Sequence, residues 1–362
     1  MSISNAKPDN ETIEVSLFGP GVGESLCVHM GAQGWVIVDS CINPATKKAV
    51  ALEYLYSIGV NPETDVKLVV ISHWHDDHVR GMSDIVRCCV NAQVAISSAL
   101  LEKEFLVLKS MFDESPLPAG MTSGLGELSK TIDILIPRLK NKAKPCCLIM
   151  VGPFQDILNL NGVKIKSLSP SSASVVQSKL ELSTAKRKLT QHKNTLPKPT
   201  ANLNAIALWV ESPQANILLG ADLEVHAHLQ LGWDAVVNSP ARGNGKALVV
   251  KVPHHGSSNG HCDDVWDKMV DPNNPISILT AYNRSNLPRD ADIERLKGIT
   301  NRLYSTTIKK TKPPKRPKVV EGFVAGIAKN REVYASQMGH IQLRIDSAGE
   351  VVVNLNHAAV KF

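Results

Sequence analysis

The sequence has no long apolar run, few aromatic residues and no closely spaced cysteine pair. Crossing a membrane takes about 20 consecutive apolar residues, and no stretch of the 362 residues approaches that. The first 15 residues are polar, whereas a secretory signal has an apolar core. These absences exclude a membrane-spanning protein, and we expect a cytoplasmic one.

Cysteine and aromatic usage narrows the class of protein further. The seven cysteines are scattered without a C-x-x-C spacing, so neither a disulfide framework nor a cysteine zinc site is indicated. Aromatic residues make up only 4% of the chain, which leaves little material for stacking single-stranded bases. The hydrophobic fraction of 43% fills a sizeable core, and a formal charge of +6 fits an anionic substrate without requiring one.

Two similar rounds of strands and helices follow one another along the chain. Short β-branched runs at 12–19, 24–30 and 35–40 predict an antiparallel meander, and a helix follows with Asn43 as its cap, Pro44 in its first turn and Gly59 at its end. Further strands are predicted at 66–73, 163–170, 204–210, 216–222, 247–255 and 276–282, with a helix near 290–299. This order predicts an α/β fold of two sheets packed face to face with helices outside.

We expect one domain over 1–362 with three additions to this core. Residues 101–150 hold Pro and Gly clusters and read as an insertion of helices and loops. A Ser/Lys-rich insertion covers 171–201, and an exposed helix or a mobile flap both remain open there. A basic loop and a C-terminal hairpin, alternating on both sides of "SAG", are predicted at 308–362.

The most informative stretch is "VVISHWHDDHVRG", residues 69–81, where an apolar run ends in a polar cluster. On an extended segment residues two apart point the same way, so His73 and His75 can present their imidazoles to one point. Asp77 and His78 then fall where the chain bends and can serve a neighbouring point. Imidazole and carboxylate together suit zinc, iron or manganese, so the cluster predicts a metal site.

The pattern His73-x-His75-x-Asp77-His78 resembles the signature of the metallo-β-lactamase superfamily. This resemblance implies an αβ/βα four-layer sandwich of two mixed sheets with outer helices, and metal ligands at the strand ends. The resemblance also implies roles for three other parts of the chain. Asp39 matches a carboxylate that supports the ligands, and Asp222 matches the carboxylate that bridges two metals. The segment "VPHHGSS", residues 252–258, matches the last ligand motif.

A narrower resemblance covers about residues 12–307. The segments "GPGVGESLCV", "ILLGADLE" and "LVVKVPHHGSS" are similar to the hydrolase domain attached to the bacterial DNA-uptake competence channel (ComEC-type). The similarity implies a nucleic acid substrate. This sequence departs from that context because it shows no membrane part.

It also departs from the wider family at two points. Ser169 stands near the position of the usual middle histidine, so the resemblance gives the first metal only His73, His75 and Asp222. One or two divalent ions, Zn²⁺ or Mn²⁺, are therefore implied. Of the two adjacent histidines, we favour His255 as ligand with Ser257 as a helix cap, and we leave His254 to contact substrate or protonate a leaving group.

We therefore expect a metal-dependent hydrolase, foremost a phosphodiesterase or nuclease using a metal-bound hydroxide, with Asp77, Asp222 and His254 in catalytic roles. A small-molecule ester, lactone or phosphoester hydrolase is one alternative, and a degenerate-site binding or scaffold module with a protein partner is another. Two basic clusters are candidates for contacting nucleic acid, with ordinary surface charge as the alternative for both. They are Lys186, Arg187 and Lys188, and Lys309, Lys310, Lys312, Lys315, Arg316 and Lys318.

Overall fold

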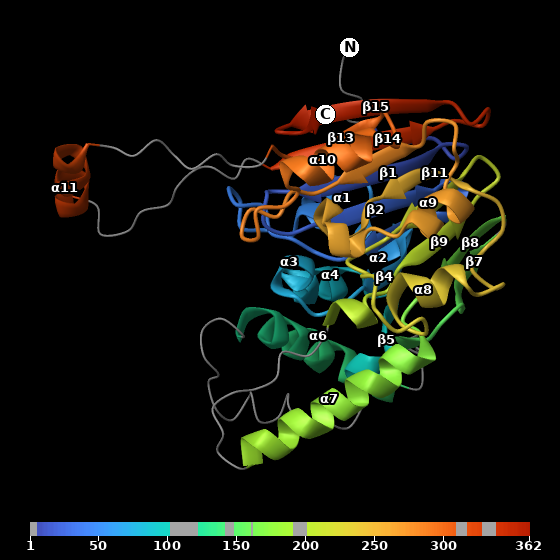
Figure 1. Cartoon of the computed structure of the whole chain (residues 1–362), viewed down its shortest axis with the longest axis horizontal. Coiled ribbons are helices and arrows are strands. Elements are labelled where there is room, and N and C mark those ends of the chain that lie inside the picture. The colour runs from blue at the N-terminus through green and yellow to red at the C-terminus, as the bar shows by residue number, and fades with distance from the viewer. Residues whose placement is uncertain are drawn as a thin grey trace.

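Two eight-stranded sheets form the centre of the computed structural model, which describes residues 6–101, 122–141, 148–160, 162–190, 201–308, 317–327 and 338–362 (Figure 1). In spatial order the first sheet consists of β15 (Val351–His357), β14 (Gly339–Ile345), β1 (Ile13–Gly19), β2 (Ser25–Met30), β3 (Trp35–Val38), β4 (Val66–Ile71), β5 (Gln93–Ser97) and β6 (Leu148–Val151). The second consists of β16 (Val360–Lys361), β13 (Leu303–Ser305), β12 (Ile276–Leu279), β11 (Ala247–Lys251), β10 (Asn216–Leu219), β9 (Leu208–Glu211), β8 (Val163–Ser167) and β7 (Asp156–Leu160).

Both sheets are mixed, as the sequence predicted. Strands β3 to β6 run parallel to one another, and so do β10 to β13, while the remaining pairs are antiparallel. The predicted meander is confirmed, because β1 pairs with β2 and β2 with β3 in antiparallel register. The C-terminal hairpin is confirmed by the antiparallel pairing of β14 with β15.

Period-two alternation in the central strands explains how the layers pack. Val36 and Val38 of β3 face the second sheet, whereas Trp35 and Ile37 face the helices on the other side. In the second sheet, Ile217, Leu219, Val249 and Ile276 point toward the first sheet and complete the core between the two sheets. Strands buried on both faces are apolar throughout, which is why these runs are nearly continuous in the sequence.

Helices cover the outer faces of both sheets. Those described are α1 (Val50–Ser57), α2 (Pro62–Asp65), α3 (Asp76–Val79), α4 (Met82–Cys88), α6 (Thr122–Lys140), α7 (Ser172–Thr190), α8 (Gly232–Val237), α9 (Asp263–Met269), α10 (Asp290–Lys297) and α11 (Lys318–Ile327). Buried residues of α1, α4 and α6 pack on the first sheet, and those of α8, α9 and α10 pack on the second. Figure 1 shows α3, α4 and α6 gathered beside β4 and β5. The four-layer arrangement of helices, sheet, sheet and helices is thus confirmed.

The predicted start of the first helix is wrong. Helix α1 begins at Val50, with Ala49 rather than Asn43 at its N-cap. Asn43 instead makes a tight turn, since its backbone oxygen accepts a hydrogen bond from Lys47 N and its side-chain amide donates to Glu53 at 2.8 Å. The end was correctly placed, because Gly59 follows the helix with φ of 75°.

Both insertions contain a long helix. Helix α6 lies in the first, and residues 102–121 and 142–147 of that insertion lie outside the described residues. The second insertion forms the 19-residue helix α7 and not a flap over that part of its length. Val176 and Leu180 are exposed on this helix. Among the described residues, no helix combines the length and apolar character needed to cross a bilayer.

Candidate metal centre

The carboxyl ends of parallel strands from both sheets meet at one edge of the sandwich. Asp39 directly follows β3, and His73 lies two residues after the neighbouring strand β4. From the second sheet, Asp222, His255 and Thr280 follow β10, β11 and β12. Because parallel strands end at the same edge, polar residues after successive strands come together there. The fold therefore assembles a polar cluster from segments more than 200 residues apart.

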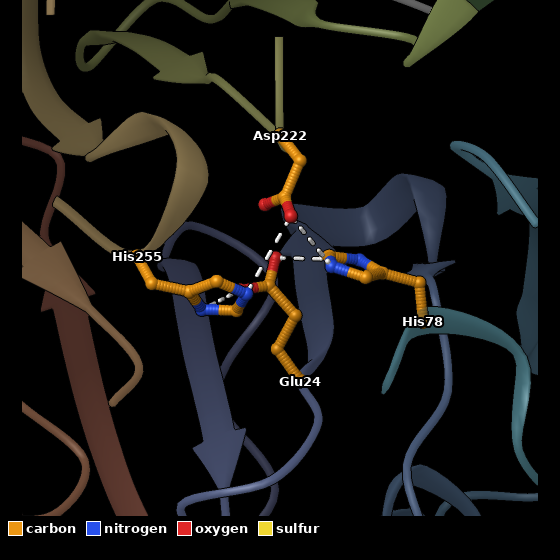
Figure 2. Close-up of side chains that lie close together, drawn as sticks. All are labelled: Glu24, His78, Asp222 and His255. Carbon is orange, nitrogen blue, oxygen red and sulfur yellow. Dashed lines mark ion pairs between the residues drawn. The ribbon is translucent and has the colours of Figure 1, made fainter. Parts of the chain in front are cut away.

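One carboxylate oxygen, Oδ2 of Asp222, lies at the centre of this cluster. It is 4.0 Å from Nε2 of His73, 3.3 Å from Nε2 of His78 and 3.5 Å from Nε2 of His255. Asp77 adds a second carboxylate, whose Oδ2 is 3.3 Å from Nε2 of His255 and 3.6 Å from Nε2 of His78. All five side chains are buried. Figure 2 shows Asp222, His78 and His255 converging from three different segments.

Asp39 fixes the orientation of two of the histidines. Its Oδ2 lies 2.8 Å from Nδ1 of His78 and accepts a hydrogen bond from Ser72 Oγ at 2.6 Å. Since the Ser72 hydroxyl donates to Asp39, it is left to accept from Nδ1 of His73 at 3.0 Å. A carboxylate only accepts, so both histidines hold their proton on Nδ1 and keep the Nε2 lone pair for the cluster.

The third histidine is oriented in the same way from the opposite sheet. Nδ1 of His255 lies 2.9 Å from Thr280 Oγ1, and this hydroxyl donates to Glu24 Oε2 at 2.7 Å. Thr280 therefore accepts from Nδ1 of His255, which again leaves Nε2 free. Three imidazoles thus turn Nε2 toward Asp222, which is how metal-ligating histidines are oriented when a supporting partner holds Nδ1.

Glu24 supports the cluster from outside. An oxygen of Glu24 can be grouped with ligand atoms of His78, Asp222 and His255, all within 4.8 Å of one another. Its oxygens, however, face the Nδ1 atoms, at 3.8 Å from His78 and 3.6 Å from His255, and Thr280 already donates to one of them. In Figure 2 the Glu24 side chain rises from below, between the two imidazoles. We therefore place Glu24 behind the ligands and not among them.

Lys251 is a fully buried cation beside the same carboxylates. Its Nζ lies 2.6 Å from Glu24 Oε1 and 3.7 Å from Asp222 Oδ1, and it donates to the backbone oxygen of Ala221 at 2.9 Å. Burial by itself lowers the pKa of this ammonium, but the charges of Glu24 and Asp222 outweigh burial and raise it. Lys251 therefore remains charged and offsets part of the negative charge of the site.

The electrostatics of the ligands are those of a site built for a cation. Burial lowers the pKa of His78 and His255, but the surrounding carboxylates, Asp222 first among them, together outweigh burial. They raise the pKa of His78 well above its usual range and that of His255 to about 9. Burial likewise raises the pKa of Asp222, but the charges of His255 and His78 hold it well below its usual range. Protons on the imidazoles thus balance the carboxylates where a metal would.

The donor set also fits a divalent metal by its chemistry. Nε2 of His78 and Oδ1 of Asp222 are buried without a hydrogen-bond partner, and buried polar atoms in that state call for a ligand. Imidazole nitrogens and carboxylate oxygens are the ligands of zinc and manganese sites. The residues present therefore fit the divalent ion that the sequence predicted.

His75 completes the histidine pair at the end of β4. Its Nδ1 lies 3.2 Å from Nε2 of His73, and the two rings meet at 4.8 Å between centroids. Burial is the main cause that lowers the pKa of both rings. His73 and His75 therefore lie side by side next to Asp222, separate from the group that His78, Asp222 and His255 form with Glu24.

His254 points away from its neighbour. Both His254 and His255 adopt left-handed backbone conformations, with φ of 47° and 52° within η4 (Pro253–Gly256), which holds their ring centroids 6.2 Å apart. Nδ1 of His254 lies 3.1 Å from Glu224, and Asn202 donates to that carboxylate at 2.7 Å. The structure thus puts His255 in the cluster and His254 in a polar pair beside it.

Several other predicted site residues lie elsewhere. The hydroxyl of Ser169 is engaged away from the cluster, because it donates to Ala205 O at 2.6 Å and accepts from Ala207 N at 2.9 Å. Ser257 precedes the 3₁₀ turn η5 (Ser258–Gly260) without a side-chain cap bond, so its predicted capping role is not seen. The side chains of Lys186, Arg187 and Lys188 on α7, and residues 309–316, lie outside the described residues.

Sequence reasoning missed the supporting residues Glu24, Lys251, Thr280 and Glu224. Two of them left a detectable signal. Lys251 interrupts an apolar strand run, "LVVKV", and a charge there needs a buried partner. Glu24 follows the glycine-rich turn "GPGVG" at the start of a buried strand. Thr280 and Glu224 left none, since both residue types are ordinary at strand ends.

Comparisons with known proteins give one family match over part of the chain and several distant structural matches. A family model described as the metallo-β-lactamase superfamily matches residues 19–132, and no curated protein matches the chain. Solved structures similar to it include the metallo-β-lactamase SMB-1 bound to 2-mercaptoethanesulfonate, with 14% identity over 62% of this chain and 69% of that one at a TM-score of 0.32. Another is the metallo-β-lactamase fold protein YhfI from Bacillus subtilis, with 11% identity over 66% of this chain and 70% of that one at a TM-score of 0.32.

The matched segment holds the strands and ligands of the first sheet. It contains β2 to β5, Asp39 and the run from His73 to His78. The second sheet supplies Asp222 and His255 to the same point, as the four-layer arrangement requires. Residues 19–132 are thus similar to the metallo-β-lactamase superfamily.

Proposed function

We propose that the protein is a metal-dependent hydrolase of phosphodiesters, foremost a nuclease. The observation that carries the proposal is Oδ2 of Asp222, which lies within 4.0 Å of the Nε2 atoms of three buried imidazoles. Each imidazole has its Nδ1 held by a serine, threonine or carboxylate. A site whose ligands are fixed in advance is suited to catalysis, because no reorganisation is then needed when charge develops.

The four-ligand position of Asp77, His78, Asp222 and His255 is the stronger of the two adjacent positions. The three-ligand position of His73, His75 and Asp222 lacks the usual middle histidine, and Ser169 does not replace it because its hydroxyl is engaged with backbone atoms. We therefore infer that one Zn²⁺ or Mn²⁺ ion binds tightly and a second binds more weakly. A bound divalent ion would lower the pKa of a coordinated water and polarise a phosphoryl oxygen.

The protein's own side chains then have distinct tasks. Asp77 and Asp222 hold negative charge at the reacting centre, and Lys251 offsets part of the charge of Asp222 and Glu24. The side chain of His254 is 17% exposed beside the centre, and its Nδ1 lies 3.1 Å from Glu224 Oε1. We assign to His254 the task of donating a proton to a departing oxygen, as a general acid does.

Cleavage of labelled oligonucleotides tests the function directly. Metal-free protein is re-supplied with manganese or zinc and offered single- and double-stranded DNA and RNA, with Asp77→Ala as the inactive control. We expect metal-dependent cleavage that the Asp77→Ala variant loses. Metal binding without cleavage of any nucleic acid would contradict the nuclease proposal and would favour a small-molecule ester hydrolase or a scaffold role.

A further inference from the structure

The turn that carries the ligand His255 has a strained backbone conformation. His254, His255 and Gly256 have φ of 47°, 52° and 80° in succession. Glycine adopts this left-handed region without steric cost, whereas the Cβ atom of each histidine is crowded by the backbone there. Such a conformation persists only where surrounding contacts hold it.

One of these contacts comes from helix α10. Arg295 Nη2 donates a hydrogen bond to the backbone oxygen of Gly256 at 2.6 Å. Gly256 is buried and directly follows the ligand. We propose that Arg295 is a positioning residue, which holds this turn and so keeps Nε2 of His255 directed at the bound metal ion. The inference rests on the proposed metal-dependent function and names a contact on which its metal centre depends.

The guanidinium group of Arg295 is itself held by Asp292, three residues earlier on α10. Nη1 of Arg295 donates to Asp292 Oδ1 at 2.8 Å. The second oxygen of that carboxylate, Oδ2, accepts from the backbone nitrogen of Arg289 at 2.9 Å. The side chain of Asp292 is 4% exposed, and that of Arg295 is 26% exposed. Because the guanidinium is planar, the bond to Asp292 fixes the direction in which Nη2 points.

Hydrogen bonds hold His255 on both sides. On the N-terminal side, His254 N donates to Ala221 O at 3.0 Å. On the C-terminal side the donor is Arg295, and a hydrogen bond from a charged donor is stronger than one between neutral groups. The ring is held separately by Thr280 at Nδ1. Loss of Arg295 should therefore release the turn on its C-terminal side.

A released turn changes the metal centre before it changes the fold. Nε2 of His255 lies 3.5 Å from Asp222 Oδ2 and 3.3 Å from Asp77 Oδ2. Metal–ligand distances are fixed to within about 0.2 Å, so a small shift of the turn takes Nε2 out of the ligand set. The fold loses less, because relaxation of the left-handed residues offsets part of the lost hydrogen bond. Metal affinity should therefore fall more than the stability of the metal-free chain.

A double-mutant cycle between Arg295 and His255 tests the proposal. The variants are Arg295→Met, His255→Ala and the two combined, with Arg295→Lys as the conservative change. Lys297→Met is the matched control, because Lys297 is an exposed lysine on the same helix that pairs only with Glu294 at 3.5 Å in the described ranges. The affinity of each full chain for Zn²⁺ is measured by competition with a chromogenic chelator. Urea unfolding of the metal-free chains and hydrolysis of bis(p-nitrophenyl) phosphate are followed in parallel.

We expect Arg295→Met to lower Zn²⁺ affinity about 10- to 100-fold, as the loss of a partner behind a metal ligand does. Arg295→Lys keeps the charge and a donor but not the planar fork, so its affinity should lie between those of Arg295→Met and wild type. Lys297→Met should change affinity less than about twofold, as a surface substitution away from the site. In the His255→Ala background, Arg295→Met should change affinity less than about threefold, because the ligand that it positions is already absent.

Two results overturn the proposal. One is a Zn²⁺ affinity of Arg295→Met equal to that of wild type. The other is the same loss with and without His255, because Arg295 would then act through another part of the protein. If Arg295→Met fails to fold, Arg295→Gln takes its place with the same expectations, since its shorter side chain ends where arginine has Nε.

The outcome is separable from that of the proposed function. A wild type that binds Zn²⁺ but hydrolyses no phosphodiester contradicts the function, and a coupled affinity cycle in that protein still supports the role of Arg295. A wild type that hydrolyses the diester while the cycle is additive overturns the role of Arg295 and leaves the function standing. A wild type that binds no divalent ion contradicts both.

Discussion

Replacing Lys251 by methionine tests the electrostatic account of the site. The substitution keeps the length of the side chain but removes the cation that lies 2.6 Å from Glu24 and 3.7 Å from Asp222. Glu24 is fully buried and would then hold an uncompensated charge. Breaking a buried ion pair by removing one partner costs about 3 to 5 kcal/mol of unfolding free energy. We expect a loss of that size in the metal-free protein.

The second half of the cycle removes the charge that Lys251 leaves behind. In the double variant Lys251→Met/Glu24→Gln, neither charge of the buried pair remains. At least about half of the lost unfolding free energy should therefore be recovered. The coupling energy between the two substitutions should then be well above the error of additivity. Urea unfolding of the metal-free chain is followed by the fluorescence of its buried tryptophans, Trp35, Trp209 and Trp233. Lys246→Met, at an exposed lysine just before β11, is the matched control and should change stability by less than about 0.5 kcal/mol. A Lys251→Met protein within about 1 kcal/mol of wild type, or additive losses in the double variant, would refute the reasoning.

Three further outcomes follow from the supporting contacts. Asp39→Asn removes the charge that holds His78, so metal affinity should fall about 10- to 100-fold in competition with a chromogenic chelator; unchanged affinity contradicts the supporting role. His254→Gln should leave metal affinity intact and slow hydrolysis more for poor leaving groups than for good ones; an equal effect on both excludes proton donation. The pKa of His255 is raised to about 9 from 6.5 in the metal-free protein, so its contribution is fully present below about pH 6.5 and is lost as pH rises through 9. That contribution amounts to about 3 kcal/mol, and a urea midpoint independent of pH between 6 and 9.5 in metal-free protein would show that it is absent.

Local sequence rules mispredicted the start of the first helix, because the capping residue also fits a turn. Asn43 and Pro44 form a plausible helix start, yet the helix begins at Val50 because Asn43 uses its amide on Glu53 and closes a turn with Lys47 instead. The N-cap at Ala49 has no side-chain hydrogen bond, so the sequence carries no capping signal for it. Burial of the apolar face of α1 against the first sheet decides where that helix begins.

The sequence by itself determined the alternation of the strands and the identity of the central ligands. Successive side chains of β3 and β4 point to opposite faces, and because both sets are mostly apolar, both faces are buried. His73 and His75 follow shortly after the end of β4. Asp222 and His255 were assigned from the resemblance to family motifs. Local periodicity and chain direction are enough for the strand assignments, since both act within a few residues.

Only the tertiary structure decided which side chains support those ligands. Glu24 pairs with Lys251 and with Thr280, and each pair joins strand ends more than 200 residues apart in the sequence. These pairs form only when the two sheets face each other. The choice of His255 over His254 depends on left-handed backbone angles that no residue pattern announces. Ligand types are a property of the sequence, whereas their charges, tautomers and neighbours are set by long-range packing.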